Sequence, residues 1–120
     1  MKRSTARIIR PLLAAALSGV VLAPWASAAP APPGISIVEG NPKDAKTWGF
    51  RPADITIKVG TTLAWSNKGG QIHSVSANEG AFDSGNLNPG TTWKFQFKAP
   101  GDYAYGCTPH PWMTGIVRVR

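Results

Sequence analysis

One short segment of the sequence places three metal-binding side chains at equal intervals. Cys107, His110 and Met113 follow one another at three-residue steps, bringing a thiol, an imidazole and a thioether into one tight loop. The chain has no other cysteine, and its only other histidine is His73. One thiolate, two imidazoles and one weak axial thioether are the donor set of a blue-copper electron-transfer site. The sequence therefore predicts a metal site made by His73, Cys107, His110 and Met113.

Each donor has a separate chemical role in such a site. The soft thiolate of Cys107 binds copper in both of its oxidation states, and the neutral imidazoles of His73 and His110 complete a trigonal plane. Met113 is expected to be a long axial ligand that helps to set the reduction potential. Copper lies above zinc in the affinity order, so zinc is expected in the site only where copper is scarce.

The segments that must position these side chains have the pattern of short strands. Trp93, Phe95 and Phe97 alternate with polar residues and predict a half-buried strand over 93–97. Further strands are predicted at 35–38, 55–59, 61–66, 72–76, 102–107 and 115–120. About seven strands without helical periodicity predict an all-β antiparallel Greek-key sandwich or barrel. Its core is expected to draw on six aromatic residues: Trp48, Phe50, Trp65, Trp93, Phe95 and Phe97.

The first 28 residues have the pattern of a signal peptide. Four basic residues precede an apolar stretch over 12–23, and Ala26-Ser27-Ala28 supplies small residues for cleavage after Ala28, with Ala29 as the alternative. We therefore predict export to the periplasm and one mature domain over 29–120, without a membrane span. Cleavage removes four of the 13 basic residues and none of the six acidic ones, so the net charge falls from +7 to +3. This modest charge disfavours a nucleic-acid partner.

At this point the sequence resembles a known family. Segments 50–52, 55–62, 65–67 and 101–107, followed by the spacing from Cys107 to Met113, are similar to the cupredoxins, and among them most to the amicyanins. The two-residue gap between His110 and Met113 is typical of that group. The resemblance implies a cupredoxin fold and copper ligation by His73, Cys107, His110 and Met113. It also implies redox protein partners, with an amine dehydrogenase as donor and a c-type cytochrome as acceptor.

The chain departs from the family pattern beside the predicted ligands. Ser74 follows the first histidine where the family usually has asparagine, and Ile72 precedes it where amicyanin and plastocyanin have proline. The backbone N–H of Ser74 is still expected to bond the Cys107 sulfur, while its side-chain tie across the site is altered. Pro109 has no N–H to donate to that sulfur, which predicts a lower reduction potential than in relatives that make this bond.

His110 is predicted to be the point where electrons enter and leave. It lies between Pro109, Pro111 and Trp112, which suggests an imidazole edge emerging through a small apolar patch. Such a patch suits weak, transient docking of a redox partner to a monomeric carrier.

Three other functions compete with that of a monomeric electron carrier that turns over no substrate. A copper-delivery protein would hold the same ion without carrying electrons. A copper oxidase needs histidines beyond His73 and His110, and a binuclear purple copper site needs a second cysteine. A purely structural β-sandwich gives no reason for the spacing of Cys107, His110 and Met113.

Overall fold

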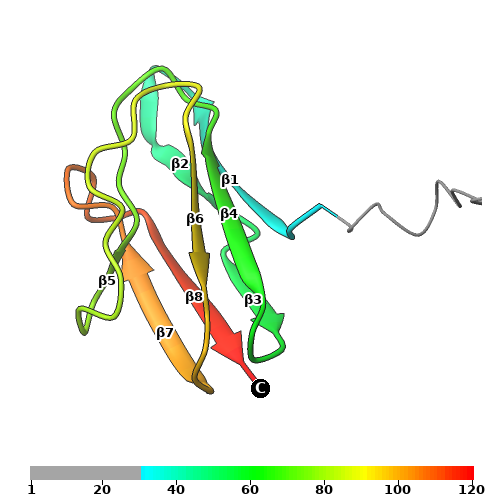
Figure 1. Cartoon of the computed structure of the whole chain (residues 1–120). Coiled ribbons are helices and arrows are strands. Elements are labelled where there is room, and N and C mark those ends of the chain that lie inside the picture. The colour runs from blue at the N-terminus through cyan, green and yellow to red at the C-terminus, as the bar shows by residue number, and fades with distance from the viewer. Residues whose placement is uncertain (1–30) are drawn as a thin grey trace, which may run out of the picture.

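The computed structural model describes residues 31–120, so the predicted signal peptide over 1–28 lies outside the described residues. This part of the chain is all-β and contains no helix, and therefore no helical segment able to cross a membrane. The described residues form eight strands, which are labelled in Figure 1. They are β1 (Gly34–Asn41), β2 (Asp44–Arg51), β3 (Asp54–Ile57), β4 (Thr62–Asn67), β5 (Ser76–Ala77), β6 (Thr92–Gln96), β7 (Gly101–Gly106) and β8 (Thr114–Val119).

The strands form two four-stranded sheets that pack face to face. One sheet has the order β2-β1-β4-β6 and the other the order β3-β8-β7-β5. Both β4 and β7 end at the side of the molecule opposite the C-terminus, where the loops that follow them lie (Figure 1). The residues after these two strands contain all four predicted metal ligands, so the sandwich brings the two ligand segments to one end.

The prediction of purely antiparallel sheets is wrong at two strand pairs. β1 pairs with β4 in parallel from Gly34↔Ala64 to Ile37↔Asn67, and β3 pairs with β8 in parallel. The remaining pairs are antiparallel. A tight turn forces antiparallel pairing only on the two strands that it joins, whereas strands brought together by longer connections can run either way. Both sheets are therefore mixed.

Six predicted segments form strands close to their expected bounds, but two regions differ. The segment 72–76 is no continuous strand: His73 makes an isolated bridge to Leu87, and Ser76 bridges Asp83 and begins the short β5. Strand β2 was not predicted, because its sequence has little apolar alternation. It forms by pairing with β1, and Trp48 Nε1 strengthens the hairpin by donating to the Asn41 carbonyl at 2.9 Å.

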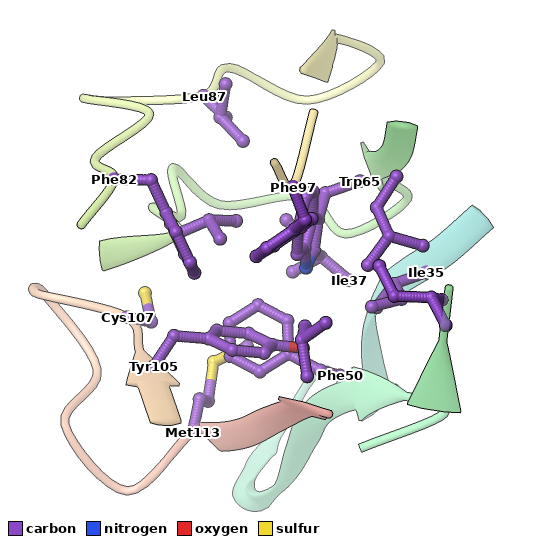
Figure 2. Packing of buried hydrophobic residues seen from close by; sticks show 14 of the residues in the cluster. Ile35, Ile37, Phe50, Trp65, Phe82, Leu87, Phe97, Tyr105, Cys107 and Met113 are labelled. Carbon is purple, nitrogen blue, oxygen red and sulfur yellow. The ribbon is translucent and has the colours of Figure 1, made fainter. Parts of the chain in front are cut away.

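The core lies between the sheets and is rich in aromatic rings (Figure 2). Trp65 and Phe97 are fully buried, as predicted, and their ring centroids are 6.3 Å apart. Trp93 and Phe95 on β6 are half-buried against this cluster. Figure 2 shows Cys107 and Met113 at one edge of the same cluster, beside Tyr105. The predicted metal site therefore borders the core directly.

Candidate metal centre

The loop that carries three predicted ligands is closed by its own backbone. The Cys107 N–H donates to the Met113 carbonyl at 3.1 Å, and the Met113 N–H donates to the His110 carbonyl at 2.9 Å. The His110 N–H in turn donates to the Cys107 carbonyl at 3.3 Å. Two of these hydrogen bonds each span three residues, and the bond between Cys107 and Met113 joins the two ends of the loop. The regular spacing in the sequence therefore becomes a compact turn between β7 and β8.

His73 is held from the other side of the site by a separate set of bonds. Its N–H and carbonyl exchange hydrogen bonds with Leu87, at 3.1 and 2.7 Å. The buried side chain of Asn67, at the end of β4, donates to the carbonyls of Gln71 and Leu87 and accepts from the Gly69 N–H. Asn67 thus fixes the loop that leads to His73 and the segment that pairs with it.

The structure brings three of the four predicted donor residues together around one point. His73 Nδ1 lies 3.1 Å from His110 Nδ1 and 3.8 Å from Cys107 Sγ, and His110 Nδ1 lies 3.5 Å from Cys107 Sγ. A circle through these three atoms has a radius of about 2.0 Å, close to the ~2.0–2.3 Å metal–nitrogen and metal–sulfur bonds of protein zinc sites. The donor set and its dimensions therefore fit a single copper ion.

The donor residues differ sharply in their access to solvent. His73, Cys107 and Met113 are at most 2% exposed, whereas His110 is half-buried. Burial lowers the pKa of His110, and the neighbouring His73 lowers it further, while the Glu39 carboxylate acts in the opposite direction. The net shift favours the neutral imidazole, which is the form that binds a metal.

Ser74 ties the two ligand segments together with both its backbone and its side chain. Its N–H donates to Cys107 Sγ at 3.4 Å, as expected from the sequence. Its hydroxyl oxygen accepts a hydrogen bond from the Thr108 N–H at 2.8 Å. The serine therefore keeps a side-chain tie across the site, although sequence analysis anticipated that the change from asparagine would alter it.

The predicted docking residues surround His110 at the surface. Pro109, Pro111 and Trp112 are exposed, and Trp112 retains half of its accessible surface. The indole Nε1 of Trp112 donates to the Ala45 carbonyl on β2 at 2.7 Å. This bond holds the ring beside His110, at a centroid distance of 5.4 Å.

Sequence analysis missed Glu39, which reaches the site from β1. Its side chain is 5% exposed, and its Oε1 lies 2.9 Å from His73 Nε2. Burial raises the pKa of the Glu39 carboxyl, but hydrogen bonds from His73 and from the N–H groups of Gly70 and Gln71 outweigh it and lower the pKa overall. The sequence held an indication of this position, because alternate residues of a strand share one face and Glu39 follows Ile35 and Ile37 in that series. Both isoleucines are buried in the structure.

Trp48 also belongs to the site, although sequence analysis assigned it to the core. It lies opposite Glu39 in the β1–β2 ladder, so both side chains occupy the same face. Its ring stands edge-on to both imidazoles, with centroids 5.9 Å from His73 and 5.2 Å from His110. Strand β2 therefore forms one wall of the ligand cluster.

A family model for copper binding proteins of the plastocyanin/azurin family matches residues 38–120. The chain belongs to this family. Amicyanin-alpha of Methylorubrum extorquens is 34% identical, with 59% of this chain and 64% of the relative covered. Plastocyanin of Scenedesmus fuscus is 35% identical, with 59% and 86% covered. The match covers only half of the plastocyanin of Tetradesmus obliquus, so this chain spans less than two thirds of two of these relatives.

Solved structures agree with the family assignment. A purple cupredoxin from Nitrosopumilus maritimus has a TM-score of 0.66 at 32% identity, covering 73% of this chain and 99% of that one. A reduced Cu(I) amicyanin mutant has a TM-score of 0.64 at 26% identity, covering 79% and 88%. A copper-containing nitrite reductase from Thermus scotoductus matches over only 23% of its own length. The likeness to this enzyme is therefore confined to a cupredoxin-like part of it.

Proposed function

We propose that this family member is exported to the periplasm and carries single electrons between redox proteins, with one copper ion held by His73, Cys107, His110 and Met113. Copper bound to such a donor set supplies a one-electron Cu(I)/Cu(II) couple. The observation that carries the proposal is the triangle of two imidazole Nδ1 atoms and one sulfur, whose size suits a metal ion.

Contacts within the protein hold three of the proposed donor residues in position. The Cys107 thiolate is the soft donor, and the Ser74 N–H points at its sulfur. His73 is held by its backbone pairing with Leu87, and Met113 is buried at the end of the closed loop. Donors held this firmly keep one compromise geometry for both oxidation states, which favours fast electron transfer because little rearrangement is needed.

His110 is proposed as the route for electrons between the site and a partner. Of the four proposed ligands it is the one with appreciable exposure, and Pro109, Pro111 and Trp112 surround it. A small apolar surface of this kind supports brief, weak docking of the protein as a monomer.

An amine dehydrogenase is proposed as the donor and a c-type cytochrome as the acceptor. The likeness to amicyanins and the short gap between His110 and Met113 support this pairing. In stopped-flow mixing with each candidate, the rate of one-electron transfer should saturate as the partner concentration rises. Replacing Trp112 by alanine should lower this rate. If electron transfer with the candidate proteins is no faster than with a small-molecule redox reagent, the proposed pairing is wrong. That result would not contradict the proposed electron-carrier function.

A visible absorption spectrum tests the function itself. Protein purified after expression of the full chain is titrated with Cu(II), then reduced and reoxidised. We expect an intense blue thiolate-to-copper band that saturates at one copper per chain, bleaches on reduction and returns on oxidation. Absence of the band in folded protein with a free Cys107 thiol would refute the proposal.

Copper delivery without electron transfer is the alternative function, and the burial of the site argues against it. A delivery protein must pass its ion to the ligands of a receiver, which requires accessible donors, whereas His73, Cys107 and Met113 are almost completely buried. Electron self-exchange, measured by NMR line broadening in mixtures of the two redox states, separates the functions. Rapid exchange supports the carrier, while slow exchange with ready loss of copper to a chelator supports delivery.

A further inference from the structure

The two imidazoles of the site differ at the ring nitrogen that points away from the donor cluster. His73 Nε2 lies 2.9 Å from Glu39 Oε1, in a pair whose side chains are 0% and 5% exposed. No such partner contacts His110 Nε2 within residues 31–120, and that ring reaches the surface. A carboxylate on the outer nitrogen of a metal-bound histidine fixes the ring orientation and its tautomer, and it raises the basicity of the ligand.

Glu39 is itself held in position by the loop that leads to His73. The Gln71 N–H donates to the same Oε1 at 2.8 Å. Glu39 comes from β1, 34 residues before His73, so this contact exists only in the folded sandwich. The carboxylate thereby connects one sheet to the segment that carries a proposed ligand.

Gly69 provides the space that this arrangement needs. A Cβ built at Gly69 would collide with the Glu39 carboxylate, lying 2.7 Å from its carboxyl carbon and 2.9 Å from its Cγ. The backbone of Gly69 is not in the positive-φ region, unlike that of five other glycines, so its conformation alone would accept a side chain. What excludes a side chain at this position is the buried carboxylate of Glu39.

We propose that Glu39 is a positioning residue for the metal site: it holds a proton on His73 Nε2, directs Nδ1 toward the metal, and places a negative charge that favours Cu(II) over Cu(I). Gly69 is also needed for this arrangement, because the absence of a side chain there leaves room for the Glu39 carboxylate. This inference rests on the proposed copper ligation by His73. A merely structural tie between β1 and the loop would stabilise the fold without altering the imidazole or the reduction potential.

The test uses Glu39→Gln, Glu39→Ala, Gly69→Ala and the double variant E39A/G69A. In metal-free wild-type protein, nitrogen and proton NMR should show His73 as the Nε2–H tautomer with a slowly exchanging proton. E39Q keeps an acceptor oxygen and should retain that tautomer. E39A should lose the slow exchange, and G69A should do the same by displacing the carboxylate. G69A in the E39A background should add no further effect, because no carboxylate remains there to displace.

Copper binding gives the second readout. We expect Cu(II) affinity to fall about tenfold in E39Q, at the lower end of the range for groups that support metal ligands. With Cu(I) affinity unchanged, this loss raises the one-electron potential by about 59 mV. The blue band should persist in E39Q, showing that the four donors still assemble.

Two outcomes would overturn the inference. One is an E39A variant that keeps the wild-type His73 tautomer, proton exchange and potential. The other is a G69A variant whose effect is equally large with and without the Glu39 carboxylate. Failure of the proposed function is distinguishable, because wild-type protein would then show no blue band at all, whereas the NMR readout does not depend on copper.

Discussion

Tyr105 offers a quantitative test of how tightly the core beside the site is packed. Its side chain is 1% exposed, and within residues 31–120 neither its hydroxyl nor the neighbouring Trp65 Nε1 has a hydrogen-bond partner. Burial raises the pKa of Tyr105 to about 12. The phenol of an unfolded chain ionises near pH 10.

The sign of the effect follows from these two pKa values. Below pH 10 the phenol is neutral in both states, and its contribution to stability is complete. Between pH 10 and pH 12 the unfolded chain ionises first, so the free energy of unfolding falls. A shift from 10 to about 12 corresponds to a loss of about 1.4 kcal/mol at pH 11 and about 2.7 kcal/mol well above pH 12.

Tyr105→Phe isolates this contribution, because every other titrating group is shared with the wild type. The variant should be at least as stable at pH 8, since it removes a buried hydroxyl that has no partner. Urea unfolding of copper-free protein at pH 8, 10 and 11 gives the difference in free energy of unfolding between the two proteins. That difference should move by about 1.4 kcal/mol in favour of the variant between pH 8 and pH 11. A constant difference would show that the hydroxyl ionises equally in both states and that the burial argument is wrong.

Three further substitutions test residues that lie beside the proposed metal ligands or hold the ligand segments in place. Pro109→Ala adds a backbone N–H that can donate to the Cys107 sulfur, and it should raise the reduction potential by roughly 50 mV, the equivalent of one ordinary hydrogen bond of about 1 kcal/mol. Cyclic voltammetry that finds no rise would contradict this prediction. Ser74→Ala leaves the Thr108 N–H without its acceptor and should cost about 1 kcal/mol in urea unfolding, while the blue band survives because the backbone N–H to sulfur remains; loss of the band would count against that division of roles. Asn67→Ala removes three side-chain hydrogen bonds and should cost about 3 kcal/mol in the same assay, and a loss below about 1 kcal/mol would mean that this side chain does not brace the ligand segment.

Much of the fold could be predicted from local patterns. The alternation at Trp93, Phe95 and Phe97 identified β6, because a half-buried strand imposes a period of two on its own sequence. Strand β2 could not be found in this way, since only Trp48 and Phe50 alternate within Asp44–Arg51 and the strand depends on pairing with β1. The parallel pairs were equally hidden, because strand direction between non-consecutive strands is set by the path of the chain.

The types and spacing of the proposed ligands could be recognised from the sequence alone. Cys107, His110 and Met113 lie on one loop whose short backbone bonds fix their spacing, so their association is a local property of seven residues. The side chains that surround these residues could not be predicted in the same way. Glu39 and Trp48 reach the imidazoles from β1 and β2, because the sandwich brings these strands against a loop far away in the sequence. Such contacts depend on the packing of whole sheets, and a single sequence records them only weakly.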